Sequence, residues 1–235
     1  LADSETVCQQ IKRKNNIQYW ALVPNVIGLE KALASQISHI AVFTAASESF
    51  NQKNIKKSIA ESFEAFRPVV EQGTQKDLTI RGYVSTAFWC PYEGQIAKET
   101  VLPVIQKLFE MGITEVSIGD TIGKATPEQV DASLSYWLQH LPKANLAMHF
   151  HDTYHHALDN IKVSLNHGIT SFDASASGLG GCPYAPGASG NVATESVVKM
   201  LHDLGYQTGI DLDKLTKAAH FIRTRLDSLP EPTPA

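Results

Sequence analysis

The chain has 235 residues, of which 43% are hydrophobic and 19% charged, an ordinary composition for a globular protein. Its net charge is −4 at pH 7, and it holds neither a long run of Lys and Arg nor an apolar stretch near the ~20 residues that span a bilayer. We therefore expect neither nucleic acid nor a membrane as a partner. The three cysteines, Cys8, Cys90 and Cys182, are too few and too scattered for a disulfide framework, which favours a reducing compartment.

Short apolar runs alternate with amphipathic helical patterns along the chain, and this alternation predicts strands and helices in turn. A helix is expected first, over residues 5–14. Pairs of a strand and a helix follow at 19–23 and 26–36, 39–44 and 52–66, 78–84 and 98–111, 115–120 and 127–138, 145–150 and 155–166, and 170–175 and 194–204, with a last helix at 212–226.

This strand–helix order, at roughly 30 residues per unit, predicts an α/β fold with parallel strands. An open doubly wound sheet and a TIM (β/α)₈ barrel both have this order. No helix opens with Gly-x-Gly-x-x-Gly, which argues against dinucleotide binding, whereas polar residues follow most strands, as they do at the mouth of a barrel. We count about six units where a closed barrel has eight. We therefore expect a partial TIM barrel over residues 1–228 that lacks the first units, followed by a proline-rich tail at 229–235.

A histidine pair, His149 and His151, stands at the end of one predicted strand. Side chains two residues apart on a strand point to the same face, so both imidazoles can bind one metal ion from one side. The glycine-rich stretch 178–191 holds a single cysteine, Cys182, whose thiol can carry a proton. The same stretch can supply one more oxygen ligand for the metal ion. The pattern favours a metal-dependent enzyme acting on a carbonyl or hydroxyacid substrate, and the alternative for a His-x-His alone is ordinary packing.

Five segments carry a more specific pattern: Arg-Gly-Tyr-Val-Ser at 81–85, Cys-Pro-Tyr-Glu-Gly at 90–94, Ser-Ile-Gly-Asp-Thr-Ile-Gly at 117–123, His-Phe-His-Asp-Thr-Tyr at 149–154 and Gly-Leu-Gly-Gly-Cys-Pro-Tyr-Ala at 178–185. Together they resemble the hydroxymethylglutaryl-CoA lyase family, a branch of the metal-dependent lyases and condensing enzymes built on a TIM barrel. The resemblance runs from about residue 3 to about residue 226. The cysteine segment is close to a signature of the lyase branch, whereas the His-x-His indicates only the wider group.

The resemblance implies that a CoA thioester, 3-hydroxy-3-methylglutaryl-CoA, is cleaved to acetyl-CoA and acetoacetate with the help of Mg²⁺ or Mn²⁺. His149 and His151 would give two nitrogen ligands and Asn191 an oxygen ligand, a mixed set that suits these cations, although zinc also accepts histidines. His149 is expected to act in catalysis as well. Cys182 is expected to protonate the acetyl-CoA carbanion, since a thiol pKa of about 8.5 lies near working pH. The alternative for Cys182 is a small buried side chain.

Further site residues follow from the same resemblance. Asp120, at a strand end, is expected in catalysis, where it would bind the substrate hydroxyl or orient a ligand histidine; the alternative is that it caps loop amides. Tyr83 and Thr121 are expected to contact substrate through their hydroxyl groups, and Asn54 to touch the CoA moiety or to cap a helix. Arg81 either forms an ion pair with a buried acid such as Asp120 or binds the substrate carboxylate.

The resemblance also implies a homodimer, in a bacterial cytoplasm or a mitochondrial matrix. One part of the family pattern has no counterpart in this sequence: an Arg-Asp pair on the first barrel strand, whose aspartate is a metal ligand, together with a glutamate from the second unit. We therefore expect little or no lyase activity from these 235 residues alone. Two other functions stay open, a related synthase that joins acetyl-CoA to a 2-oxo acid and a non-catalytic fragment. The cysteine segment favours the lyase over the synthase.

Overall fold

The protein, seen here in a computed structural model, is described over residues 3–181 and 190–228. Six parallel strands form one curved sheet in the order β1-β2-β3-β6-β7-β8. These strands are β1 Trp20–Leu22, β2 His39–Ala45, β3 Thr79–Ser85, β6 Glu115–Asp120, β7 Leu146–Phe150 and β8 Ser171–Asp173. A short antiparallel hairpin, absent from the sequence prediction, pairs β4 Trp89–Cys90 with β5 Gly94–Gln95.

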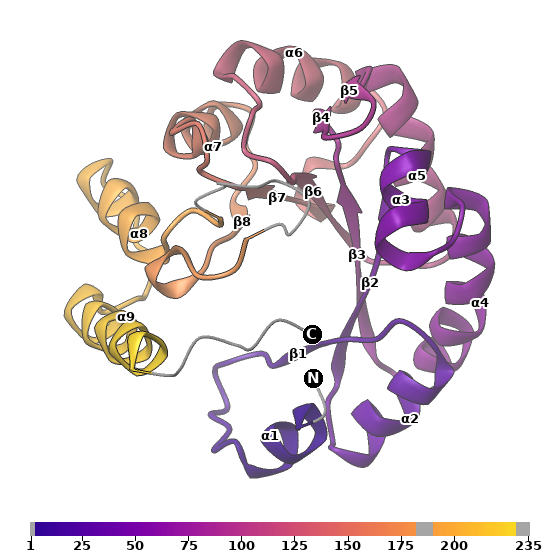
Figure 1. The fold of residues 1–235 in the computed structure, drawn as a ribbon, viewed down its shortest axis with the longest axis horizontal. Helices are drawn as coiled ribbons and strands as arrows, with labels where there is room; N and C mark the ends of the chain where they lie inside the picture. The colour runs from indigo at the N-terminus through magenta and orange to yellow at the C-terminus, as the bar shows by residue number, and fades with distance from the viewer. Residues whose placement is uncertain (1–2, 182–189, 229–235) are drawn as a thin grey trace.

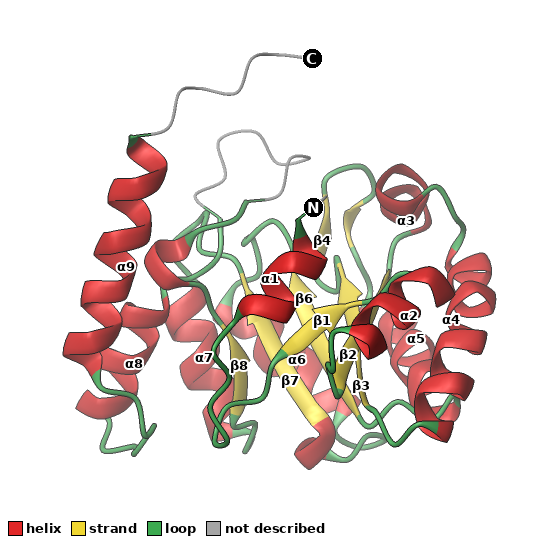
Figure 2. Cartoon of the chain, turned by 90° about the horizontal axis from the view of Figure 1, so that it is seen from below, coloured by secondary structure: helices red, strands yellow, loops and turns green. Residues whose placement is uncertain are grey.

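Helices follow the strands and lie outside the curved sheet (Figure 1, Figure 2). They are α1 Ser4–Gln10, α2 Val26–Ala34, α3 Glu48–Ile55, α4 Ile59–Gln75, α5 Lys98–Glu110, α6 Pro127–Trp137, α7 Ala157–Asn166, α8 Thr194–Asp203 and α9 Leu212–Asp227, with 3₁₀ turns at Lys143–Asn145 and Ala176–Gly178. No helix in the described ranges is long and apolar enough to cross a membrane.

The sheet forms part of a barrel. Within the described residues β1 pairs with β2 alone and β8 with β7 alone, so these two edge strands do not pair with each other. Figure 1 shows the strands curving around the centre of the molecule, from β1 through β3 and β7 to β8. The expected α/β fold, a partial TIM barrel with about six strands, is thereby confirmed. The predicted tail at 229–235 lies outside the described residues.

The two faces of the sheet differ in chemistry, because alternate residues of a strand point to opposite faces. One face packs on the helices and holds fully buried apolar side chains such as Val42, Ile118 and Met148. The opposite face, toward the barrel interior, carries polar side chains in adjacent register positions: Arg81, Tyr83, Glu115, Ser117, His149 and Asp173.

Two helices stand where the apolar spacing predicts a single helix over 52–66. Helix α3 ends at Ile55 because Lys56 adopts a left-handed conformation, with φ of +57°. Helix α4 begins after Ser58, whose hydroxyl accepts the Glu61 amide while the Glu61 carboxylate accepts the Ser58 amide. This capping box starts a new helix within a periodic apolar pattern, so spacing alone does not reveal the break.

Further element boundaries differ from the prediction, and α4 continues to Gln75 where the spacing predicts an end at residue 66. Helix α1 ends at Gln10 rather than at residue 14, because the chain is extended at Ile11 and Arg13 turns back to donate a hydrogen bond to the Cys8 carbonyl. Helix α7 begins at Ala157 rather than at residue 155, because His155 has φ of +60°. Strand β8 ends at Asp173 instead of continuing to residue 175.

Candidate active site

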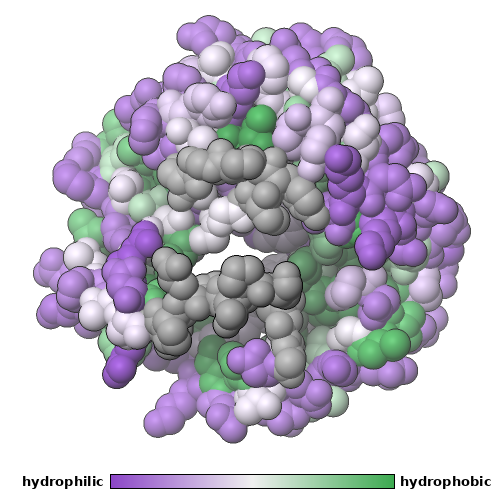
Figure 3. Space-filling view, in the orientation of Figure 1, coloured by the Kyte–Doolittle hydropathy of each residue, from purple (hydrophilic) through white to green (hydrophobic). Residues whose placement is uncertain are grey.

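A cavity of about 700 Å³ lies at the carboxyl ends of the strands and reaches into the barrel interior. Figure 3 shows a hollow at the centre of this face of the molecule. Active sites of barrel enzymes lie at this end of the strands. The cavity brings together five of the residues that the sequence marks as candidates, namely Asn54, Tyr83, Thr121, His149 and His151.

The histidine pair lies in the wall of this cavity, with ring centroids 5.3 Å apart. His151 is 7% exposed, and its Nδ1 is buried with no hydrogen-bond partner among the described residues. Burial, with a smaller contribution from His149, lowers the pKa of His151 to about 4. An uncharged imidazole with a buried, unpaired nitrogen is the state in which histidine binds a metal ion.

Asn191, the third predicted ligand, lies beside the histidine pair through a backbone bridge to His151. Its amide nitrogen donates to the carbonyls of Leu179 and Gly180 at 3.0 Å each, so the side-chain oxygen is the atom left to bind a cation. Within the described residues, no three His, Cys, Asp or Glu side chains are grouped so that they could hold a metal ion. Two imidazoles and one amide oxygen nevertheless fit a divalent cation that keeps open positions for substrate and water.

A buried charged network lies next to His149, and the sequence analysis did not find its central residue. Asp173, the last residue of β8, accepts a hydrogen bond from Arg81 Nη1 at 2.9 Å and one from Ser117 Oγ at 2.7 Å. Its Oδ2 also lies 3.3 Å from His149 Nδ1. On its other side, Arg81 Nε lies 2.6 Å from Glu115 Oε1. Four strands thus contribute to one network that reaches the cavity.

The members of this network perturb one another's pKa values. Burial acts to raise the pKa of Asp173, yet the hydrogen bond from His149 and the charge of Arg81 outweigh it and hold this pKa below its ordinary value. Burial, followed by the charge of Asp173, raises the pKa of Tyr83 to about 12. In the neutral range Asp173 is therefore ionised and Tyr83 keeps its proton.

Tyr83, Thr121 and Asn54, the predicted substrate contacts, all line the cavity. The Tyr83 hydroxyl accepts a hydrogen bond from Arg81 at 3.0 Å, and its ring meets the His149 ring edge-on with centroids 6.4 Å apart. Thr121 Oγ1 accepts the backbone amide of Thr86 at 2.7 Å, which fixes the Thr121 side chain at the cavity wall. Their roles toward substrate stay predictions.

Asp120 is fully buried but does not line the cavity. It pairs in register with Phe150, and both residues belong to the face that packs on the helices. Its carboxylate accepts two backbone amides of the following loop, at 3.2 and 2.9 Å, and burial raises its pKa to about 6. These are the contacts of the capping alternative, and a catalytic role for Asp120 stays a prediction. Arg81 forms the expected structural ion pair, but with Asp173 and Glu115 instead of Asp120.

Cys182 lies outside the described residues, so its predicted role as a proton donor is untested by this geometry. Its neighbour Gly181 lines the cavity. The two described ends of this stretch are joined, because the Asn191 amide donates to the Gly180 carbonyl at 3.0 Å. Gly190 has φ of +93° at this join, and a Cβ there would collide with the Gly180 carbonyl. The stretch that carries Cys182 therefore begins and ends beside the cavity.

Known proteins are similar to this chain in fold and in sequence. Residues 1–222 match the HMGL-like family. The chain belongs to this family. A cytoplasmic 3-hydroxy-3-methylglutaryl-CoA lyase of Danio rerio is 48% identical over 222 residues, which cover 94% of this chain and 66% of the relative.

Two solved structures extend the family comparison. The crystal structure of the HMG-CoA lyase from Brucella melitensis has a TM-score of 0.94 and 49% identity, and covers 97% of this chain and 81% of that one. An HMG-CoA lyase from Acinetobacter baumannii, solved in complex with coenzyme A and 3-methylmalate, has a TM-score of 0.90 and 34% identity, with coverages of 99% and 80%.

HMGL-like enzymes are metal-dependent, and the chain has two histidines, His149 and His151, in the wall of this cavity. The curated relatives are longer than this chain, which spans 66%, 75% and 76% of three of them. The relatives include cytoplasmic and mitochondrial lyases.

Proposed function

We propose that this protein, in a form that also holds the Arg-Asp pair of the family, cleaves 3-hydroxy-3-methylglutaryl-CoA to acetyl-CoA and acetoacetate, and that His149, His151 and Asn191 hold Mg²⁺ or Mn²⁺ for this reaction. One observation carries the proposal: His149 and His151 share the wall of the cavity, and Asp173 lies within hydrogen-bonding reach of His149. Membership of the HMGL-like family, with a relative solved in complex with coenzyme A, supports a CoA thioester as the substrate.

In this reaction the bond between C2 and C3 of the substrate breaks, the tertiary hydroxyl on C3 loses its proton, and C2 gains one. A divalent cation held by His149, His151 and Asn191 would lower the pKa of the substrate hydroxyl and orient the substrate. Tyr83 and Thr121 would position the substrate by hydrogen bonds, and Tyr83 can donate one because its pKa is about 12. Cys182 would deliver the proton to C2. Asn54 would contact the CoA moiety.

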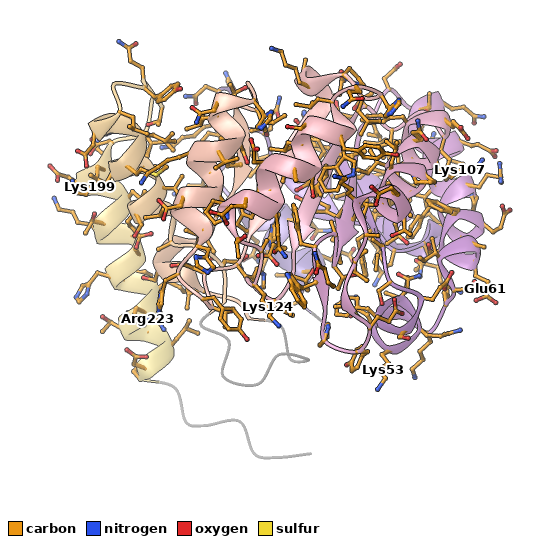
Figure 4. All side chains as sticks on the ribbon, turned by 90° about the horizontal axis from the view of Figure 1, so that it is seen from above. Lys53, Glu61, Lys107, Lys124, Lys199 and Arg223 are labelled. Atoms are coloured by element: carbon orange, nitrogen blue, oxygen red, sulfur yellow. The ribbon has the colours of Figure 1, made fainter. Side chains whose placement is uncertain are left out.

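Positive side chains at the same end of the molecule support the binding of an anionic CoA. Lys53, Lys124 and Arg223 all lie at this end in Figure 4, whereas Lys107 and Lys199 lie toward the opposite end. The ammonium groups of Lys53 and Lys124 each stand over an aromatic ring, at 4.1 and 3.8 Å from its centroid. These positive charges would attract the phosphates of CoA to this end of the molecule.

The test is acetoacetate release from 3-hydroxy-3-methylglutaryl-CoA, with Mg²⁺ or Mn²⁺ added after treatment with a chelator. It is run on these 235 residues and, where the gene encodes residues ahead of Leu1, on the longer chain. We expect metal-dependent turnover on the order of 1 to 1000 per second in the longer form and little in the shorter, because the Arg-Asp pair of the family has no counterpart here. The variant His149→Ala is the inactive control.

Two results would contradict the proposal. Condensation of acetyl-CoA with a 2-oxo acid, without any cleavage, would identify a synthase. Inactivity of every form toward both substrates would favour a non-catalytic protein. We further propose that the protein is a homodimer, which sedimentation tests. We also propose that it resides in a bacterial cytoplasm or a mitochondrial matrix, which cell fractionation tests.

A further inference from the structure

Asp173 is an acid in the cavity wall that neither binds the cation nor takes part in the reaction as proposed. Its Oδ2 lies 3.3 Å from Nδ1 of His149, and the two side chains are only 18% and 27% exposed. A neutral imidazole carries its proton on either ring nitrogen, and the partner of one nitrogen decides which one stays free to bind a metal. A carboxylate beside Nδ1 keeps the proton there and leaves the lone pair on Nε2.

The carboxylate of Asp173 is itself fixed from two sides. Arg81 Nη1 donates to Oδ1 at 2.9 Å, and Ser117 Oγ donates to Oδ2 at 2.7 Å. Glu115 in turn holds Arg81, at 2.6 Å from its Nε. The acid therefore cannot rotate away from His149 without giving up a charge-assisted hydrogen bond to Arg81.

The second histidine lacks such a partner. Nδ1 of His151 has no hydrogen bond to any residue of the described ranges. His149 is thus the ring whose proton position the protein specifies.

We propose that Asp173 is a positioning residue that fixes His149 in the Nδ1–H tautomer and so presents Nε2 to the divalent cation, while Arg81 and Ser117 hold its carboxylate. This inference rests on the proposed function for the place of the cation, and it adds an acid outside the ligand set. The inference separates residues that would bind the cation directly from residues that orient one of these ligands, His149.

The decisive variant is Asp173→Asn, and its matched control is Glu115→Gln. Both remove one negative charge beside Arg81, but only Asp173 contacts His149. Long-range ¹⁵N–¹H NMR at pH 8.5 reports which ring nitrogen of each histidine carries the proton in the metal-free protein. The signal that disappears in the variant His149→Gln is the signal of His149. We expect the Nδ1–H tautomer in the unaltered protein and in Glu115→Gln, and loss of this preference in Asp173→Asn.

Mn²⁺ affinity, measured without substrate from the spin-resonance signal of the free ion, is the second readout. We expect Asp173→Asn to weaken Mn²⁺ binding by about 10- to 100-fold, the usual effect of removing a partner behind a metal ligand. Glu115→Gln should change it by less than about threefold. In the His149→Gln background, Asp173→Asn should have no further effect, because it acts through that ring.

Several outcomes would overturn the positioning role: an Nε2–H tautomer in the unaltered protein, equal effects of Asp173→Asn and Glu115→Gln, or no Mn²⁺ binding at all. If Asp173→Asn fails to fold, Ser117→Ala replaces it, with an expected weakening of about 2- to 10-fold; unchanged affinity and tautomer in that variant would count against the role. A protein that binds Mn²⁺ in this Asp173-dependent way yet cleaves no substrate would keep the positioning role and overturn the proposed reaction.

Discussion

Asp120 and Asp173 are both acids at the carboxyl ends of strands, yet their surroundings are opposite. Asp120 points toward the helices, where its carboxylate accepts backbone amides and burial raises its pKa to about 6. Asp173 points into the barrel, where Arg81 and His149 hold its pKa below the ordinary value despite burial. The difference follows from the two-residue repeat of a strand. A polar residue at a strand end therefore reaches the cavity only if it also belongs to the inner face.

This comparison divides the sheet into two regions with separable functions. The inner face should control cation binding, since Tyr83, His149 and Asp173 on it border the cavity. The outer face should control stability and leave cation binding unchanged, since its side chains are packed in the core. Substitutions on adjacent residues of one strand test this division.

Removal of both imidazoles should have the largest effect on Mn²⁺ binding and on substrate cleavage. In the double variant His149→Ala, His151→Ala we expect no measurable Mn²⁺ binding and no acetoacetate release, because the two nitrogen ligands are lost together. Titration with Mn²⁺ and the cleavage assay measure this. Retention of Mn²⁺ affinity within about tenfold of the unaltered protein would place the cation elsewhere, since loss of an outer partner alone costs about 10- to 100-fold.

Met148→Ala tests the opposite face at the residue next to His149. Met148 is fully buried against the helices, so its truncation should lower the free energy of unfolding by about 2–5 kcal/mol. Mn²⁺ affinity should stay within about threefold of the unaltered value. Urea denaturation followed by circular dichroism gives the first quantity. A loss of affinity as large as that of Asp173→Asn would break the division between the faces.

Asp120→Asn should have a smaller effect, again on stability. The amide keeps one oxygen acceptor but turns an NH₂ group toward backbone amides, which leaves one of them unpaired at a cost of about 1–3 kcal/mol. Cleavage and Mn²⁺ affinity should be nearly unchanged in protein that remains folded. A drop in kcat of more than about tenfold without loss of stability would instead support the catalytic role that the family resemblance implies for Asp120.

The main elements and the centre of the site are readable from the sequence because they depend on local spacing. Strand–helix alternation is enough to predict a partial barrel, and the spacing of His149 and His151 alone puts both on one face. The break between α3 and α4 is hidden because Lys56 and the Ser58 capping box interrupt an apolar pattern that continues across them.

Asp173 could not be recognised from local spacing. Its partners Arg81 and Ser117 stand 92 and 56 residues earlier in the chain, and only the closing of the sheet brings them together. The placement of Asp120 could have been anticipated, because it shares the parity of Ile118 and Val116, two residues of the apolar outer face. Parity along a strand is thus a stronger guide to an inner-face residue than nearness to a strand end.

The smallest expected effect on stability comes from the helix layer, at the start of α6. Thr126 caps α6, because its hydroxyl accepts the Gln129 backbone amide while the Gln129 side-chain oxygen accepts the Thr126 backbone amide. Thr126→Ala should lower the free energy of unfolding by about 1 kcal/mol. Mn²⁺ affinity and cleavage should not change, although Thr126 directly follows the loop whose amides Asp120 accepts. Weakened Mn²⁺ binding in this variant would mean that the loop before α6 couples the two faces, and the face to which a residue belongs would then no longer predict its effect.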